Sequence, residues 1–210
     1  MKTLIKLIEK VQTKHKVVAF TFDDGPDAQF TRQILNIFRK VNGKATFFMV
    51  GEQIDANEEI AREVYEAGHE IGNHTYTHPD LTTISLEEAT IELQRMDDRI
   101  RELTGKSPSS FRPPFFKINP SLAELAKGAG YDMISACNTG ARDWEQPQPS
   151  VDFMVDQTME VTEGGSVYIF HDGYGDRTNT VEAVSSLVER LHTEEYRFVT
   201  ISELISMCSY

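Results

Sequence analysis

Two adjacent aspartates and a pair of histidines have the residue types and the spacing of a metal site. Asp23 and Asp24 follow the apolar run Val17–Phe22, where two like charges need a cation or a hydrogen-bond network to offset their repulsion. His74 and His78 lie four positions apart. With one of the two aspartates they form a two-histidine, one-carboxylate set. Such a set leaves positions open for water and substrate, and it suits zinc or another first-row divalent ion.

Each half of this pattern also has a purely structural interpretation. The Asp-Gly dipeptide is common in surface turns, and an isolated HxxxH pair is weak evidence for a metal. The segment from His74 to His78 contains β-branched residues and precedes Pro79, which favours a loop over a helix. No glutamate follows His74, so the pair is not the helical HExxH motif. The metal hypothesis therefore depends on both motifs meeting in the fold.

Three further segments carry residues that could act on a bound substrate. Arg112 begins the sequence Arg-Pro-Pro-Phe-Phe, whose prolines stiffen the backbone and suit a guanidinium held against a carboxylate or a presented backbone N–H. Asp143 and Trp144 lie in a loop-like stretch. His171 follows the apolar run Ser166–Phe170, and a histidine there can act as an acid or a base near neutral pH. A rigid connector, a core tryptophan and a structural histidine are the alternatives.

Short β-favouring runs alternate with segments of helical period along the chain, which is typical of a parallel α/β fold. About seven strands are predicted, enough for a barrel. They span Val17–Phe22, Ala45–Val50, Glu70–Asn73, Ser109–Arg112, Tyr131–Ala136, Ser166–Phe170 and Phe198–Ile201. Helices are predicted over Thr31–Val41, Glu58–Ala67, Ser85–Leu103, Pro120–Ala129, Val151–Val161 and Val181–His192. Ser85 and Glu88 form a capping box at the start of the third helix.

Nearly every cluster of unusual polar residues comes directly after a predicted strand. The carboxyl ends of parallel strands converge on one face of an α/β barrel, where the active sites of such folds lie. We therefore expect the clusters that begin at Asp23, His74, Arg112, Asp143 and His171 to meet in one pocket.

The 210 residues are predicted to form a single domain with a short N-terminal helix within residues 1–15. Lys6, Glu9 and Lys10 interrupt the apolar run that a signal peptide would need, so Met1–Val11 is expected to be an amphipathic helix. No apolar stretch approaches the ~20 residues that span a bilayer. As written, the sequence is expected in the cytoplasm. A leader that is missing from the sequence would instead place the protein outside the cytoplasm.

The composition excludes several classes of partner. A net charge of −12 argues against nucleic acid and against an anionic membrane surface. Cys137 and Cys208 form no CxxC pair, so a disulfide scaffold or a cysteine zinc site is not expected. A hydrophobic fraction of 40% and a charged fraction of 26% are ordinary for a globular protein. We expect a monomer.

The order of the motifs resembles the polysaccharide deacetylase family, the NodB-homology domain of carbohydrate esterase family four. The resemblance runs from about Val17 to Ile205 and includes the complete TFDDGP and HxxxH signatures. It implies a distorted (β/α) barrel with fewer strands than eight. It also implies removal of N-acetyl groups from glycans that contain N-acetylglucosamine, such as chitin oligomers or peptidoglycan. One divalent ion is implied as cofactor, with zinc expected and cobalt, nickel or manganese as alternatives.

The resemblance also implies a role for each matching residue. In that pattern Asp23 is the general base, Arg112 holds it, and Asp24 binds the metal with His74 and His78. The remaining matches are His171 as the general acid, Asp143 as the residue that tunes it, Trp144 as a wall of the acetyl pocket, and Phe115 as the backbone donor to the oxyanion. Ile169 takes the place of leucine in the family's leucine-x-histidine motif, beside the substrate. Phe115 replaces the usual tyrosine, which removes a hydroxyl, and Phe116 replaces a frequent glycine, which is expected to change the shape of the groove.

Two other functions fit the same fold. A hydrolase of a small cyclic amide or of another acylated small molecule is the first, and the intact metal set weighs against it. The second is a sugar-binding domain without catalysis. Binding alone does not require both Asp23 and His171, so their presence favours the enzyme.

Overall fold

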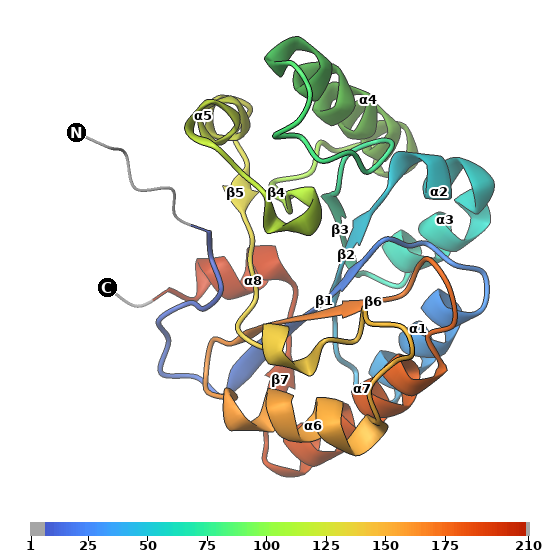
Figure 1. The fold of residues 1–210 in the computed structure, drawn as a ribbon. Helices are drawn as coiled ribbons and strands as arrows, with labels where there is room; N and C mark the ends of the chain where they lie inside the picture. The colour runs from blue at the N-terminus through green and yellow to red at the C-terminus, as the bar shows by residue number, and fades with distance from the viewer. Residues whose placement is uncertain (1–6, 209–210) are drawn as a thin grey trace.

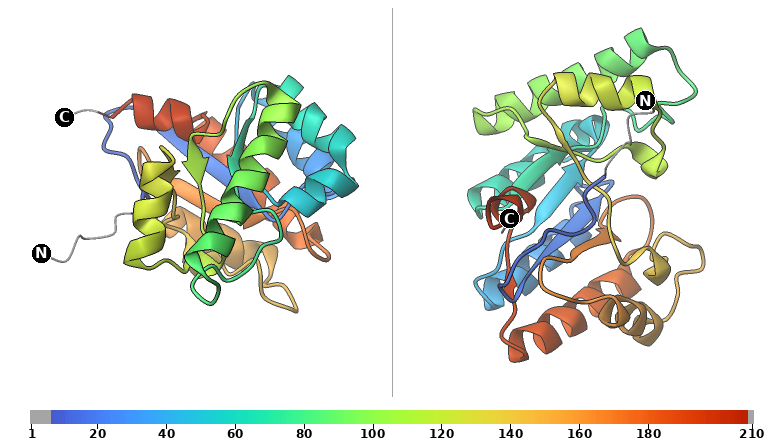
Figure 2. Two further views of the ribbon diagram at one scale, coloured as in Figure 1. Left: turned by 90° about the horizontal axis from the view of Figure 1, so that it is seen from above. Right: turned by 90° about the vertical axis from the view of Figure 1, so that its left-hand side faces the viewer.

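A parallel sheet forms the centre of the computed structural model, which describes residues 7–208 (Figures 1 and 2). Over these residues the sheet has seven strands in the order β5-β4-β3-β2-β1-β6, with β7 beside the start of β1. The strands are β1 (Val17–Asp23), β2 (Thr46–Met49), β3 (Glu70–Asn73), β4 (Ser110–Phe111), β5 (Asp132–Met133), β6 (Val167–His171) and β7 (Arg197–Phe198). The predicted distorted (β/α) barrel is confirmed.

Helices surround the sheet, with α4 and α5 at one end and α6 and α7 at the other (Figure 1). The helices are α1 (Phe30–Lys40), α2 (Gly51–Ala56), α3 (Glu58–Glu66), α4 (Leu86–Thr104), α5 (Pro120–Gly128), α6 (Val151–Glu160), α7 (Thr178–Thr193) and α8 (Ile201–Ser206). Short 3-10 turns occur at Pro114–Phe116 and Thr139–Ala141. All six predicted helices are present, with ends shifted by up to three residues, and the capping box of Ser85 and Glu88 begins α4.

The predicted last strand, Phe198–Ile201, is wrong at its end because a helix begins there. Thr200 accepts a hydrogen bond from the backbone of Glu203, and the Glu203 side chain accepts one from the backbone of Thr200. This second capping box satisfies two N–H groups at the start of α8. The strand therefore stops at Phe198.

The central strand β1 is buried along its whole length, as is typical of a parallel strand covered on both faces. Side chains alternate between the two faces of a strand. Phe20 and Phe22 belong to the main core, where they contact Phe38 of α1 and Phe170 of β6. The alternate residues therefore point to the opposite face, and Asp23 is the last of them. The packing of the phenylalanines thus fixes the direction in which this carboxylate leaves the sheet.

The N-terminal helix predicted within residues 1–15 is wrong for the part that the structure describes, and residues 1–6 lie outside it. Ile8 pairs with Ile134 next to β5, and Lys10 pairs with Ser166 next to β6. The segment thus lies between two strand edges and bonds to both. Ile8 and Val11 also pack in the core cluster around the start of β1. These partners outweigh the local helix preference, which is worth less than ~1 kcal/mol per residue.

No helix within residues 7–208 is both long enough and apolar enough to cross a membrane.

Candidate active site

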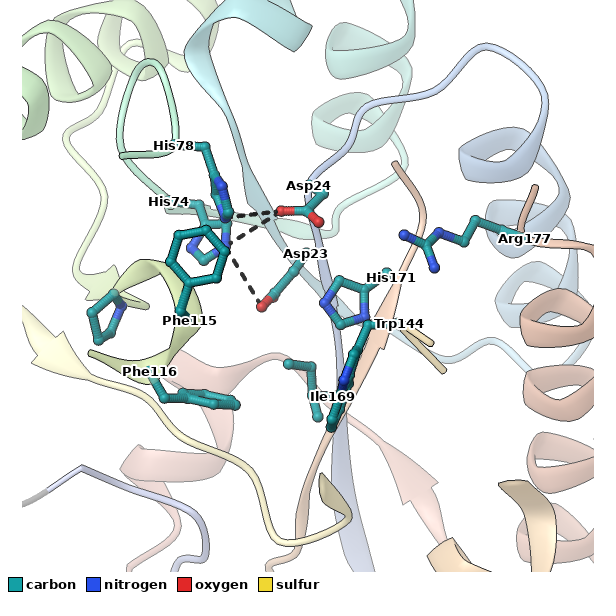
Figure 3. A pocket seen from close by; sticks show the side chains of 11 residues that line it. Asp23, Asp24, His74, His78, Phe115, Phe116, Trp144, Ile169, His171 and Arg177 are labelled. Atoms are coloured by element: carbon teal, nitrogen blue, oxygen red, sulfur yellow. Dashed lines mark ion pairs between the residues drawn. The ribbon is translucent and has the colours of Figure 1, made fainter. Parts of the chain in front are cut away.

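Loops that follow the ends of the strands surround a pocket of about 500 Å³ (Figure 3). Arg112 and Asp143 are almost fully buried and support residues of the pocket. The other predicted site residues line it directly: Asp23, Asp24, His74, His78, Phe115, Trp144, Ile169 and His171. The five clusters that were separate in the sequence therefore meet at one face of the barrel.

Asp24, His74 and His78 bring three ligand atoms together, all within 4.8 Å of one another. Asp24 Oδ1 lies 3.2 Å from His78 Nε2 and 3.6 Å from His74 Nε2. The same carboxylate oxygen is buried and has no hydrogen-bond donor among the described residues. Buried oxygens without a partner are rare and call for an explanation such as an ion. Two imidazole nitrogens around an unpaired carboxylate oxygen fit one divalent cation.

The backbone orients the histidines of this set. His74 Nδ1 lies 2.6 Å from the carbonyl oxygen of Arg112, so this nitrogen donates and Nε2 is left for a metal. Burial lowers the pKa of both His74 and His78, which favours the neutral imidazole that a metal requires. Asp24 and His78 both have a positive φ, of 74° and 58°. Such left-handed backbone is costly outside glycine and is typical of functional sites.

Gly25 closes the turn that carries the paired aspartates. A Cβ atom at this position would lie 2.5 Å from Oδ1 of Asp172, a fully buried carboxylate. Asp172 Oδ2 accepts a hydrogen bond of 2.5 Å from the hydroxyl of Thr31 in α1. The glycine in the TFDDGP motif is therefore required by the close approach of Asp172.

Arg112 holds Asp23 at the end of β1. Its Nη1 donates to Asp23 Oδ1 and to the hydroxyl of Thr21, both at 2.6 Å, and its Nη2 donates to the carbonyl of Ser135 at 2.9 Å. Burial alone would raise the pKa of Asp23, but the charge of Arg112, with the charge of His171 and the hydrogen bond from Arg112, outweighs it and lowers that pKa. The Asp23 carboxylate is therefore ionised near neutral pH and can accept a proton.

His171 enters the pocket from the end of β6, with Asp143 behind it. His171 Nδ1 lies 2.8 Å from Asp143 Oδ1, and the backbone N–H of His171 donates to Asp143 Oδ2 at 2.7 Å. Burial opposes the charged imidazolium. The Asp143 carboxylate overcomes that effect, with help from Asp23 and Asp24, and the pKa of His171 rises to about 9. His171 is thus protonated near neutral pH and can donate a proton.

Aromatic and aliphatic side chains form the walls between these polar groups. The Trp144 ring lies 6.0 Å from the His171 ring, and Ile169 is buried beside them in the pocket. Phe115 is 61% exposed at the mouth of the pocket, with its ring 4.9 Å from that of His78. Phe116 also lines the pocket and lies over the Arg112 guanidinium. The residue in place of the usual glycine therefore covers the group that holds Asp23.

Sequence reasoning missed two buried groups close to these residues. Asp172 directly follows His171, and this adjacency in the sequence indicates a second carboxylate near the pocket. Arg177 lines the pocket from the loop between β6 and α7. No motif or regular spacing marked it, because its hydrogen-bond partners are backbone carbonyls.

The sequence model of the polysaccharide deacetylases matches residues 10–134, the part of the chain that carries both metal-site motifs. The chain belongs to the polysaccharide deacetylase family. It is 36% identical to a peptidoglycan-N-acetylglucosamine deacetylase of Bacillus cereus, over 93% of this chain and 91% of that one. The chain is therefore an enzyme of this family, and relatives of similar length act on N-acetylated glycans.

Solved structures of other polysaccharide deacetylases share the fold. A peptidoglycan N-acetylglucosamine deacetylase crystallised with an N-oxidanyl-benzamide is 30% identical and superimposes with a TM-score of 0.88, covering 95% of this chain and 92% of that one. A pseudoenzyme of the family from Bacillus anthracis is 25% identical, with a TM-score of 0.86 over 99% of this chain and 72% of its own. Because a pseudoenzyme has the same fold, the side chains of the pocket are what argue for catalysis.

Proposed function

We propose that this polysaccharide deacetylase hydrolyses N-acetyl groups of N-acetylglucosamine in a glycan, with Asp23 as the general base and His171 as the general acid. The observation that carries the proposal is the opposite tuning of these two groups within one pocket. The pKa of Asp23 is lowered and that of His171 is raised to about 9, so one can accept and the other can donate a proton at the same pH.

Hydrolysis of an amide needs a nucleophilic water, stabilisation of the carbonyl oxygen and a proton for the departing nitrogen. When bound, a divalent ion lowers the pKa of water to about 7 and polarises a carbonyl. Asp23 removes the proton from the water that attacks the acetyl carbon. As the C–N bond breaks, His171 gives its proton to nitrogen, and the products are acetate and a free amine.

Other side chains place the acetyl group for this reaction. Trp144 and Ile169 offer an apolar wall beside His171 for the methyl group. The backbone N–H of Phe115 is proposed to donate to the carbonyl oxygen as charge develops on it. Asp143 keeps His171 protonated, and Arg112 keeps Asp23 oriented and ionised.

For the ion, we propose zinc held by Asp24, His74 and His78. Two imidazoles and one carboxylate are typical of catalytic zinc sites with an open position. Cobalt, nickel and manganese are the alternatives, since the same donors bind other first-row ions. Elemental analysis of the purified protein distinguishes them.

The substrate class is tested by acetate release from a panel of glycans. The panel contains chitin oligomers, peptidoglycan fragments and O-acetylated xylan, each with zinc and after chelation. We expect acetate from at least one N-acetylated glycan, loss of release after chelation, and no release by the Asp23→Asn variant. The proposal fails if the metal-loaded wild type releases acetate only from the O-acetylated xylan, or if it releases none and instead opens the ring of a small cyclic amide added to the panel. The cytoplasmic location, the monomeric state and the single-domain organisation stay predictions.

A further inference from the structure

Arg177 is a buried cation that the proposed reaction does not use. It is 4% exposed and lies just before α7, with its guanidinium directed toward Asp24 and His171 (Figure 3). Among residues 7–208 no carboxylate lies within ion-pair distance of it. A buried charge without a counter-charge in ion-pair contact is costly. Its position beside the catalytic groups therefore needs an explanation.

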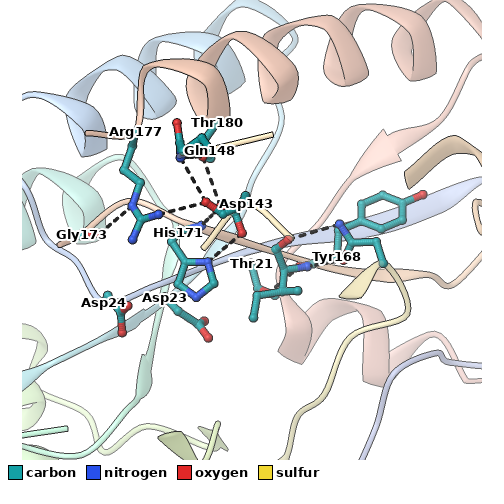
Figure 4. Close-up of polar contacts among 12 residues, drawn as sticks. Thr21, Asp23, Asp24, Asp143, Gln148, Tyr168, His171, Gly173, Arg177 and Thr180 are labelled. Atoms are coloured by element: carbon teal, nitrogen blue, oxygen red, sulfur yellow. Dashed lines mark hydrogen bonds and ion pairs between the residues drawn. The ribbon is translucent and has the colours of Figure 1, made fainter. Parts of the chain in front are cut away.

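The guanidinium joins the two loops that flank the acid (Figure 4). Arg177 Nε donates to the carbonyl of Gly173 at 2.8 Å, and Nη1 donates to the carbonyl of Asp143 at 3.1 Å. Gly173 lies two residues after His171. One side chain thus bonds to the backbone of Asp143 and to the backbone just beyond the histidine that Asp143 tunes.

Asp143 depends on such contacts because its loop has little regular structure. The only helical turn between β5 and α6 is the three-residue segment Thr139–Ala141. The Asp143 carboxylate is held by His171 and by the Thr180 hydroxyl at 3.2 Å. Its carbonyl is held by Arg177 and by the Gln148 amide, both at 3.1 Å. Thr180 and Arg177 lie at the start of α7, so this end of the helix donates hydrogen bonds to Asp143 at two places.

We propose that Arg177 is a positioning residue for the acid, acting through Asp143. It holds the Asp143 backbone so that the carboxylate stays on Nδ1 of His171 and the other ring nitrogen stays directed into the pocket. A guanidinium suits this role because two of its nitrogens reach two separate carbonyls in a fixed geometry, which a single ammonium group does not do. The inference rests on the proposed function, since it assigns Arg177 to the same reaction.

The test compares Arg177→Met and Arg177→Lys with Arg142→Met as the matched control. Arg142 is next to Asp143 in sequence, but it is 48% exposed and pairs with Glu145. We expect Arg177→Met to lower kcat between about 10- and 100-fold, in the range for a misplaced catalytic group, with KM within about twofold. Arg177→Lys should fall in between, and Arg142→Met should keep wild-type kcat. Metal content should not change in any of the three.

The double variant with Asp143→Asn decides how Arg177 acts. If Arg177 works only through the Asp143–His171 pair, adding Arg177→Met to Asp143→Asn should reduce kcat by no more than about twofold beyond Asp143→Asn alone. Fold-losses that multiply would overturn the proposal, as would an unchanged kcat in folded Arg177→Met. If Arg177→Met does not fold, the same comparison is made with Arg177→Lys.

A spectroscopic measurement separates this inference from the proposed function. If wild-type protein releases no acetate from any glycan, the proposed function fails. The positioning role is then judged from the downfield proton resonance of His171 Nδ1–H, which a hydrogen bond to a carboxylate produces. That resonance should be sharp in the wild type and in Arg142→Met and broadened or lost in Arg177→Met. Its persistence in Arg177→Met would reject the role.

Discussion

Asp23 and Asp24 are neighbours in sequence, yet their surroundings prepare them for different tasks. Asp23 accepts a hydrogen bond from the guanidinium of Arg112 and lies 3.7 Å from Nε2 of His74, whereas Asp24 Oδ1 has no donor among the described residues and faces His78. The backbone explains the split, because Asp24 turns out of the strand with a positive φ. Adjacent side chains on one strand would point to opposite faces. The turn is what brings both into the same pocket.

The two aspartates are therefore expected to respond differently to the same substitution. Asp23→Asn should keep the metal and lose turnover by at least ~10²-fold, as expected for removal of a general base. Asp24→Asn should lose metal, because an amide is a weaker ligand than a carboxylate. Metal content by elemental analysis and kcat, measured on the same preparations, check both. Equal metal loss in the two variants would show that the roles are assigned wrongly.

The pair of Asp143 and His171 predicts the pH dependence of activity. His171 must be protonated in the active form, and its pKa is raised to about 9, so activity should fall as pH rises through that region. Asp143→Asn removes the largest favourable charge, and the basic limb of kcat/KM should move to lower pH. Asp23 and Asp24 also favour the imidazolium, but a bound cation offsets their charge, so the variant isolates the effect of Asp143. A basic limb that stays in place would mean that another group is the acid.

At the scale of elements, the loop after β6 packs against the turn between β1 and α1, where Asp172 lies close to Gly25. Gly25→Ala should destabilise the protein by about 1–3 kcal/mol, because the new methyl group meets the buried Asp172 carboxylate. It should also weaken metal binding, since Asp24 precedes Gly25. Thermal unfolding and metal titration measure the two effects.

A second substitution tests the cause of that loss. Asp172→Ala removes the obstacle, so the Gly25→Ala/Asp172→Ala protein should bind metal better than Gly25→Ala alone. If the double variant loses the sum of both single effects, the close approach is not the reason for the glycine.

Most elements that local patterns describe well were predicted, and those that depend on distant partners were not; α8 is an exception, because the local capping box of Thr200 and Glu203 marks its start and was missed. The strand Val17–Phe22 is predictable because its apolar run is buried on both faces, and α4 because Ser85 and Glu88 mark its start. The convergence of the pocket residues followed from their place after strands. The segment at Ile8 could not be predicted, because its bonding partners lie more than 100 residues away. Arg177 was missed for a similar reason, since carbonyl partners leave no trace in side-chain patterns.

At the scale of the whole molecule, the metal set ties two loops together. Asp24 follows β1, while His74 and His78 belong to the loop after β3. A cation that binds only the folded chain stabilises it by about 2.7 kcal/mol at a free concentration of 100 times Kd. For a chain of this size, that corresponds to an increase in Tm of roughly 5–10 °C.

Calorimetry with and without zinc should show this increase for the wild type. His74→Ala and His78→Ala should lose it, and His192→Ala, which changes an exposed histidine at the C-terminal end of α7, should keep it. An equal increase in all four proteins would place the stabilising ion elsewhere on the molecule.

The extended segment around Ile8 and Lys10 also determines where this catalytic domain can be truncated or fused to another protein. The sequence resemblance begins near Val17, which suggests a boundary there. A piece trimmed at that point would uncover backbone groups beside Ile134 and Ser166, at two strand edges that the segment now covers. Bare edges recruit strands from other molecules. A fusion or a domain swap between relatives should therefore include the segment around Ile8 and Lys10, because this segment protects the two strand edges from pairing with other molecules.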